Sequence, residues 1–234
     1  MARIFNLLVL VCSFMNAQPQ LYDFSYDGDN RQYYLYTPDS LEAGAALIFV
    51  FHGYSSSATT IMGYSNLNDL ADENGFVVCY PQGLIDDWDY RFWNVGYEFH
   101  SNETHDDVGF VKALAYYLQV QYQLSSYNTY STGMSNGGDM SYLLACQASD
   151  VFSAVAPVAG CMMSWIYDSC EPISPIPVFE IHGTEDDVTY YDGDPYNADG
   201  WGVYLDIPSI ICLLYTSPSP RDQRGSGVAG WALK

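Results

Sequence analysis

A serine between glycines gives the sequence its clearest chemical signal. Gly133-Met134-Ser135-Asn136-Gly137 matches the pattern G-x-S-x-G. In many hydrolases this pattern carries a nucleophile on a sharp turn between a strand and a helix. The glycines allow the close backbone packing and the strained serine conformation that such a turn needs. We therefore predict Ser135 as an acyl-transfer nucleophile, with a glycine-rich turn that has no chemistry as the alternative.

Two further segments could complete such a site. His52-Gly53 follows an apolar run and opens a loop of small residues, where a backbone N–H can stabilise an oxyanion. We expect the oxyanion donors to be the N–H groups of Tyr54, in this loop, and of Asn136, next to the serine. Asp186 follows another β-prone run and comes after Ser135 in the chain. We expect its carboxylate to orient a catalytic histidine.

Together these segments resemble the secreted α/β-hydrolases of the polyhydroxybutyrate depolymerase and feruloyl esterase type. Four motifs carry the resemblance: His52-Gly53, Asp107-Val108-Gly109-Phe110, Gly133 to Gly138, and His182-Gly183-Thr184 with Asp186. The resemblance implies a serine esterase that uses a Ser-His-Asp triad and neither cofactor nor metal. Its substrates would be carboxylic esters, either polyesters or feruloyl and acetyl esters of polysaccharides.

The histidine of that triad is missing from its expected place. In the family it follows the aspartate, but all four histidines of this chain precede Asp186. Hydrophobic patterning stops near Ile211, and the segment from Cys212 to Asp222 resembles a translated sequencing adapter. A serine- and proline-rich linker is the alternative. We expect an incomplete hydrolase domain over residues 18–211, without its last strand and helix, and a non-native tail over residues 212–234. The chain itself should then be nearly inactive.

The N-terminus has the features of a secretory signal peptide. Arg3 precedes a mostly apolar run from Ile4 to Met15, and Ala17 offers a small residue at the cleavage site. We expect residues 1–17 to be removed and the protein to be secreted. An apolar first helix is the alternative, and the run is too short for a stable membrane anchor.

Cysteines fit the same oxidising compartment. Four lie in the body of the chain: Cys79, Cys146, Cys161 and Cys170. The short loop between Cys161 and Cys170 favours a bridge between these two. Cys146–Cys170 is the rival pairing, and free buried thiols are the other alternative.

Charge narrows the range of partners. The net charge of −21 argues against a basic nucleic-acid face and against binding to an anionic membrane. An ester substrate, small or polymeric, is the expected partner. Two other functions stay open: a non-catalytic carbohydrate-binding protein on a degenerate hydrolase fold, and a serine peptidase of the same fold.

These residues need a frame that brings them together. Strands and helices alternate along the body, which predicts an α/β-hydrolase fold with a mostly parallel sheet and helices on both faces. Ligands of such sheets bind at the carboxyl ends of the strands, where Gly53, Ser135 and Asp186 are expected. The elements expected are a hairpin (21–26 and 31–37), strands at 47–51, 76–80, 127–132, 152–158 and 178–181, and helices at 59–74, 107–123 and 139–148.

Two other groups of side chains could have a role in the site. The segment from His100 to Asp107 is rich in imidazoles and carboxylates, as a metal site would be. A solvated loop in which Asp106 or Asp107 caps the next helix is the favoured interpretation. His105 could also serve as the base, although it comes from the wrong place in the chain order. Trp93, in a long aromatic loop, is a candidate for the substrate cleft, with packing inside that loop as the alternative.

Overall fold

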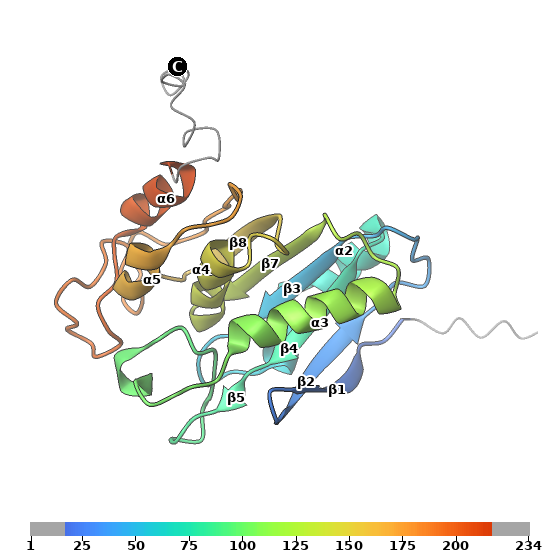
Figure 1. The fold of residues 1–234 in the computed structure, drawn as a ribbon, viewed down its shortest axis with the longest axis horizontal. Helices are drawn as coiled ribbons and strands as arrows, with labels where there is room; N and C mark the ends of the chain where they lie inside the picture. Colours follow the sequence, from blue (N-terminus) through green and yellow to red (C-terminus); the bar gives the residue numbers. More distant parts are fainter. Residues whose placement is uncertain (1–16, 217–234) are drawn as a thin grey trace, which may run out of the picture.

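The computed structural model describes residues 17–216 of the chain. The expected signal peptide, apart from Ala17, and residues 217–234 of the expected tail lie outside this range. Within it, six strands form one sheet in the order β1-β2-β4-β3-β7-β8, with helices packed on either side (Figure 1). None of the helices in this range is both long and apolar enough to cross a bilayer.

The sheet is mostly parallel, as predicted. The antiparallel hairpin lies at one edge and pairs with the parallel strands through an antiparallel contact between β2 and β4. From β4 onward, neighbouring strands run parallel. The strands are β1 (Gln20–Tyr26), β2 (Asp29–Tyr36), β3 (Leu47–Phe51), β4 (Val77–Gln82), β7 (Thr129–Met134) and β8 (Ala154–Val158). The last expected strand is present only as two parallel bridges, Val178 to Val155 and Ile181 to Val158.

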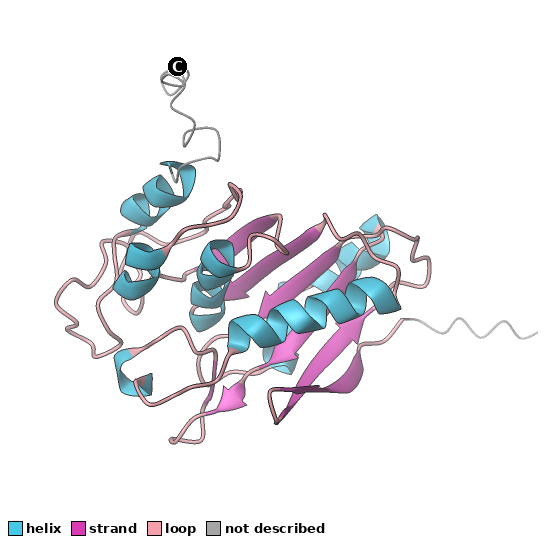
Figure 2. Ribbon diagram, in the orientation of Figure 1, coloured by secondary structure: helices cyan, strands magenta, loops and turns pink. Residues whose placement is uncertain are grey.

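Helices cover both faces of the sheet (Figure 2). One face carries α1 (Ala58–Ser65) and α2 (Leu67–Asn74), and the other carries α3 (Asp107–Gln121) and α4 (Asn136–Gln147). Side chains of β3 alternate between the two layers, because successive residues of a strand point to opposite faces. Phe49 and Phe51 pack into the α3 and α4 side, whereas Val50 packs beneath α1.

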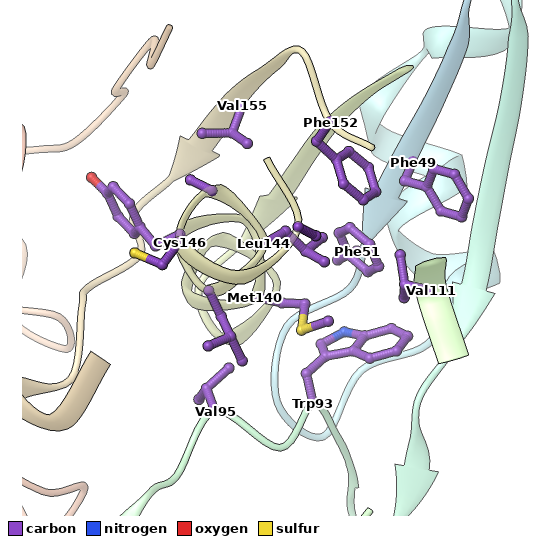
Figure 3. Close-up of a cluster of buried hydrophobic side chains, with 14 of the residues drawn as sticks. Phe49, Phe51, Trp93, Val95, Val111, Met140, Leu144, Cys146, Phe152 and Val155 are labelled. Atoms are coloured by element: carbon purple, nitrogen blue, oxygen red, sulfur yellow. The ribbon is translucent and has the colours of Figure 1, made fainter. Parts of the chain in front are cut away.

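The larger core surrounds α4. Figure 3 shows Met140 and Leu144 of this helix facing Phe51 and Trp93, with Phe152 close by. All five side chains are essentially buried. At about 25 cal/mol per Å² of apolar surface, such large side chains each contribute about 2 to 3 kcal/mol to stability.

Two expected elements differ in detail. The single helix predicted over residues 59–74 is two helices, because Asn66 adopts the left-handed conformation (φ 53°) and breaks it. Gly75 ends α2 in the left-handed conformation (φ 71°), as glycine commonly does after a helix. Between the strands predicted at 152–158 and 178–181, where no helix was expected, the structure contains α5 (Ser164–Ser169).

Shorter elements complete the described chain. The long aromatic loop contains β5 (Leu84–Ile85), β6 (Arg91–Phe92) and the 3₁₀ turn η1 (Glu98–His100). The last helix, α6 (Ile207–Thr216), continues across residue 212, where the tail was expected to begin.

Candidate active site

Ser135 lies on a strained turn between β7 and α4. Its backbone has φ 54° and ψ −122°, a region that residues other than glycine rarely adopt. Strain of this kind costs about 1–3 kcal/mol and persists only where the surrounding structure holds it. The Ser135 N–H donates a hydrogen bond of 2.9 Å to the carbonyl oxygen of Val158, the last residue of the neighbouring strand β8. The serine also precedes the first turn of α4, whose N-terminal end favours negative charge.

The flanking glycines permit this turn. A Cβ atom on Gly137 would lie 2.2 Å from the carbonyl oxygen of Phe51, and one on Gly133 would lie 2.4 Å from the carbonyl oxygen of Gly137. Both distances are far below van der Waals contact and involve backbone atoms that cannot move aside. The pattern G-x-S-x-G is therefore a packing requirement of this turn.

The loop after β3 lies directly against the serine. Phe51 pairs with Gly133 in the sheet register, so β3 and β7 end side by side. A Cβ atom on Gly53 would stand 3.5 Å from Ser135 Cβ and 3.2 Å from the Met134 carbonyl oxygen. The next residue, Tyr54, thus has its backbone close to the nucleophile.

Two backbone N–H groups at this point have no acceptor in the part of the chain that the structure describes. Within residues 17–216, the Tyr54 N–H makes no hydrogen bond. Asn136 is the first residue of α4, where an N–H group has no intrahelical acceptor. Its side-chain amide is occupied elsewhere, since it accepts from the Trp93 N–H at 2.7 Å and donates to the Trp93 carbonyl oxygen at 3.0 Å. The Asn136 side chain therefore fixes the turn, and its N–H remains available.

A small pocket opens in front of Ser135. Its walls combine aromatic, polar and small apolar side chains, and these come from segments that lie far apart in the sequence. The lining residues are Tyr97, Ser135, Asp139, Cys161, Val188, Thr189, Trp201 and Tyr204.

Asp186 lies behind one wall of this pocket. Its Oδ1 accepts the N–H groups of Val188 and Thr189, both at 2.9 Å, and so shapes the two residues that line the pocket on this side. Its Oδ2 lies 3.7 Å from His182 Nε2. The Asp186 carboxylate itself does not line the pocket.

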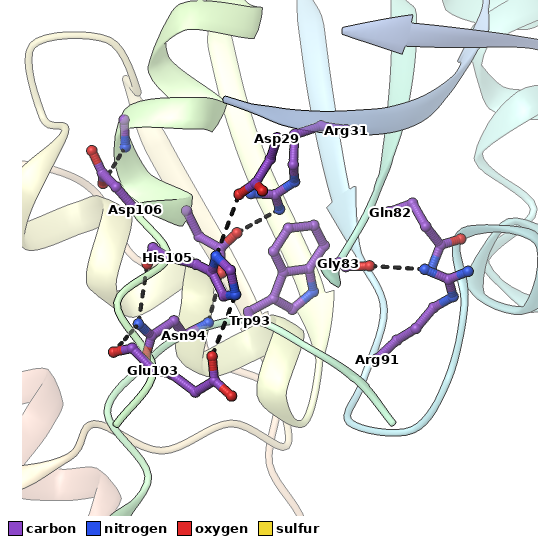
Figure 4. A network of polar contacts seen from close by, with 12 residues as sticks. Asp29, Arg31, Gln82, Gly83, Arg91, Trp93, Asn94, Glu103, His105 and Asp106 are labelled. Atoms are coloured by element: carbon purple, nitrogen blue, oxygen red, sulfur yellow. Dashed lines mark hydrogen bonds and ion pairs between the residues drawn. The ribbon is translucent and has the colours of Figure 1, made fainter. Parts of the chain in front are cut away.

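None of the chain's four histidines lines the Ser135 pocket. His182 contacts Glu180 and the carbonyl oxygen of Thr189, and His100 contacts Asp86. Figure 4 shows His105 between two carboxylates, which belong to Asp29 and Glu103 and lie 3.3 Å from its ring nitrogens.

The fourth histidine, His52, is fully buried. Its Nδ1 donates to the Gly53 carbonyl oxygen at 2.7 Å, and its Nε2 accepts the Gly83 N–H at 3.0 Å. Burial lowers the pKa of His52 to about 4, so the ring is neutral and supports the loop. No histidine in the described structure is placed to act as a base for Ser135.

Asp139 is a pocket residue that the sequence analysis did not identify. Its Oδ2 accepts the Tyr97 hydroxyl at 2.5 Å, and its Oδ1 accepts the Cys161 N–H at 2.6 Å. Burial raises the pKa of this carboxyl to about 7, although these hydrogen bonds oppose the shift. Asp139 lies in the first turn of α4, four residues after Ser135, which directly precedes the helix; this spacing is a signal that could have revealed it.

The acidic segment before α3 is structural. The Asp106 side chain caps α3 by accepting the Gly109 N–H at 2.8 Å, which is the favoured interpretation of this segment. Asp107 forms a buried ion pair with Arg31 at 2.5 Å, and the Arg31 guanidinium stacks over the Phe110 ring, 4.0 Å from its centroid. Between residues 17 and 216, no three His, Cys, Asp or Glu side chains are grouped so that they could hold a metal ion.

The prediction that Trp93 lies in the substrate cleft is wrong. Its side chain has no exposed surface, and its Nε1 donates to the His52 carbonyl oxygen at 3.0 Å. The ring packs edge-on against Phe51, with centroids 5.0 Å apart. The alternative, packing inside the loop itself, does not describe its position either, because the indole packs into the main core, where its N–H donates to the His52 carbonyl oxygen.

The predicted Cys161–Cys170 bridge is also wrong. The structure has the rival disulfide, Cys146–Cys170, with Cα atoms 4.8 Å apart. Cys161 is a buried thiol in the pocket wall, because Asp139 holds its N–H at the start of α4. The bridge instead ties the C-terminal end of α4 to the end of α5.

Comparison with known protein families gives one match over most of the chain. A family profile described as "Esterase PHB depolymerase" matches residues 31–204. This range includes the loop at Gly53, the serine turn and Asp186.

Individual relatives are esterases by name. Feruloyl esterase B of Thermothelomyces thermophilus is 30% identical over 223 residues, which cover 94% of this chain and 70% of the relative. A putative esterase of Nocardia uniformis subsp. tsuyamanensis is 31% identical over 176 residues, which cover 71% of this chain and 48% of the relative. A bifunctional acetylxylan esterase/xylanase of Neocallimastix patriciarum is 26% identical over 164 residues. This match covers 70% of the chain but only 22% of that longer protein.

Solved structures share the fold. The acetyl xylan esterase from Aspergillus awamori superposes with a TM-score of 0.53 at 21% sequence identity, over 61% of this chain and 53% of that one. The similarity supports the predicted arrangement of a mostly parallel sheet between two layers of helices.

Proposed function

Since the chain belongs to the PHB depolymerase esterase family, we propose that the protein is a serine hydrolase of carboxylic esters. The observation that carries the proposal is the strained Ser135 turn, with Gly53 packed against its Cβ atom. Holding a serine at φ 54° costs free energy, and such strain is found mainly at functional sites. A glycine-rich turn without a catalytic role would not need this conformation.

In the proposed reaction, Ser135 Oγ attacks the ester carbonyl carbon. Negative charge develops on the carbonyl oxygen, which accepts hydrogen bonds from the N–H groups of Tyr54 and Asn136. In comparable enzymes each such donor stabilises the transition state by about 3 kcal/mol. Collapse of the tetrahedral intermediate releases the alcohol and leaves an acyl group on the serine, which water then removes.

The reaction needs a base for the serine proton. Because none of the four histidines lies at the pocket, we propose that the base is a histidine outside these 234 residues, oriented by Asp186. Without that base the serine hydroxyl remains a poor nucleophile at neutral pH. The 234-residue chain alone should therefore turn over esters very slowly.

The pocket and the relatives support a proposal for the class of ester. The pocket has an apolar, aromatic wall formed by Tyr97, Trp201 and Tyr204. Such a wall suits an uncharged acyl group better than a charged acyl group. Relatives named feruloyl esterase and acetylxylan esterase support feruloyl or acetyl esters of polysaccharides as substrates, with polyesters as a further class. The Cys146–Cys170 disulfide supports a secreted protein, and the charge of −21 supports the absence of nucleic acid among its partners.

Chemical rescue can test the proposal on the chain as it is. Imidazole in the buffer can take the place of the absent base, and a fluorophosphonate probe reports an activated serine by covalent labelling. We expect labelling at Ser135, located by peptide mass spectrometry, to be slow alone and faster with imidazole. Ser135→Ala should abolish it, whereas Ser101→Ala, at an exposed serine, should not change it.

Hydrolysis of ethyl ferulate, followed by chromatography, provides the second readout. Imidazole-dependent turnover above that of Ser135→Ala would support an esterase. Equal rates for the two proteins, together with no label at Ser135, would overturn the proposal.

A further inference from the structure

A buried carboxylate lies behind Tyr54, outside the Ser135 pocket. Asp86 Oδ2 accepts the Tyr54 hydroxyl at 2.6 Å and lies 3.0 Å from His100 Nε2. Its Oδ1 accepts the N–H groups of Trp88 and Tyr90, both at 2.9 Å. The side chains of Asp86 and His100 have no exposed surface.

This arrangement keeps Asp86 ionised. Burial alone would raise the pKa of the carboxyl, but the hydrogen bonds from Tyr54, His100 and two backbone N–H groups outweigh burial and lower it. Hydrogen bonds to an ionised acceptor are roughly twice as strong as neutral ones. The hydrogen bond to Asp86 therefore holds the Tyr54 side chain firmly by its hydroxyl group.

The loop from residue 83 to residue 100, which contains Asp86, also contacts the residues on either side of Tyr54. On one side, the Gly83 N–H and Trp93 Nε1 each donate to His52, both at 3.0 Å. On the other, the Ser55 N–H donates to the Arg91 carbonyl oxygen at 2.8 Å. The loop from residue 83 to residue 100 thus contacts the chain before Tyr54, its side chain, and the chain after it.

The direction of the Tyr54 N–H follows from these contacts. The Gly53 carbonyl and the Tyr54 N–H belong to one planar trans peptide and point in opposite directions. The Gly53 carbonyl oxygen accepts His52 Nδ1 at 2.7 Å and the Ser56 N–H at 3.2 Å, which fixes the peptide plane. A shift of Tyr54 would rotate this plane and change the direction of the Tyr54 N–H.

The Tyr54 ring has little room to shift by itself. Five aromatic or imidazole rings surround it, with centroids 5.6 to 6.4 Å away: Tyr90, Tyr97, Phe99, His100 and Trp201. Tyr97 and Trp201 also line the pocket, so the same aromatic cluster connects the oxyanion loop to the acyl pocket wall.

We propose that Asp86 is a positioning residue for the oxyanion hole: by holding the Tyr54 hydroxyl, it fixes the Tyr54 backbone N–H as an oxyanion donor. The inference rests on the proposed function of Ser135. It adds a residue that touches neither the substrate nor the nucleophile and acts only through Tyr54.

The kinetics of phosphonylation can test this role. The phosphonyl oxygen of a fluorophosphonate adduct occupies the position of the oxyanion, so the maximal labelling rate kinact reports the donors, while KI reports initial binding. In imidazole buffer we expect Asp86→Asn and Tyr54→Phe to lower kinact by roughly ten- to a hundredfold, as small misplacements at active sites do. KI should change by less than about twofold.

Matched controls separate positioning from folding. Asp87→Asn changes the neighbouring exposed aspartate and should label like the parent chain. Tyr54→Phe keeps the ring and its packing and removes only the hydroxyl, so it decides the question if Asp86→Asn fails to fold by circular dichroism.

The possible failures are distinguishable. If the parent chain shows no labelling at Ser135 even with imidazole, the proposed function fails and the inference fails with it. If the parent is labelled and kinact is unchanged in the folded variants, only the inference about Asp86 is overturned.

Discussion

The buried carboxyl of Asp139 should make the protein less stable in mildly alkaline solution than in mildly acidic solution. Asp139 is 2% exposed, and burial raises its pKa from 3.8 to about 7. The folded state therefore binds a proton that the unfolded state has already released between about pH 4 and pH 7. Stability from this group is fully present below the unfolded pKa and is lost as pH rises through the folded pKa.

The size of the effect follows from the shift. A pKa difference of about 3 units corresponds to about 4 kcal/mol, at 1.36 kcal/mol per unit. Most of this, about 3 kcal/mol, should appear between pH 5 and pH 8. Asp139→Asn removes the charge, and an amide at this position can still accept the Cys161 N–H and donate to the Tyr97 hydroxyl.

Urea unfolding at pH 5 and pH 8, followed by circular dichroism, measures the effect. The parent chain should lose about 3 kcal/mol more than Asp139→Asn over this range. Asp168→Asn, at an exposed aspartate, should behave like the parent. Some pH dependence should persist in Asp139→Asn, because burial also raises the pKa of Glu180. Identical pH dependence in the parent and Asp139→Asn would refute the reasoning.

Three further predictions concern the frame of the site, and urea unfolding measures all of them. Gly137→Ala should destabilise the protein by about 3 kcal/mol, because its Cβ atom would stand 2.2 Å from a carbonyl oxygen of β3; a neutral effect would contradict the packing argument. Arg31→Met should cost about 3–5 kcal/mol by leaving the buried Asp107 unpaired, and adding Asp107→Leu should recover most of the loss; no recovery would speak against an unpaired charge as the cause. Reduction of Cys146–Cys170, which closes a separation of 24 residues, should cost about 3 kcal/mol, whereas reductant should not affect Cys146→Ala/Cys170→Ala. Equal sensitivity of both proteins would disprove the bridge.

The frame of the site could be predicted from the sequence because it obeys local rules. The apolar run before His52 indicated a strand buried on both faces, and the glycines around Ser135 indicated the sharp turn. These two features place the serine and the loop at Gly53 at the carboxyl ends of strands, whereas their direct contact depends on the pairing of β3 with β7. Asn66 shows the limit of such rules, since its left-handed conformation divides a segment whose pattern predicts one helix.

The walls of the pocket could not be predicted in this way. Tyr97, Trp201 and Tyr204 come from loops that have no hydrophobic period, and their positions depend on contacts with distant segments. Trp93 shows the same difficulty, because a tryptophan in an aromatic loop can face either the cleft or the core. Its indole N–H donates to a backbone carbonyl oxygen in the core. No pattern in the amino-acid sequence predicts this partner.

The burial of α4 has a consequence for how this protein could change its specificity. Every residue from Asn136 to Cys146 is buried, so nearly the whole helix is closed to solvent and tolerates few replacements. New substrate preferences should therefore arise by exchange of side chains in the surrounding loops, at positions such as Val188 and Trp201. A mutagenesis library aimed at those loops should yield more altered enzymes than one aimed at the helix that follows the serine.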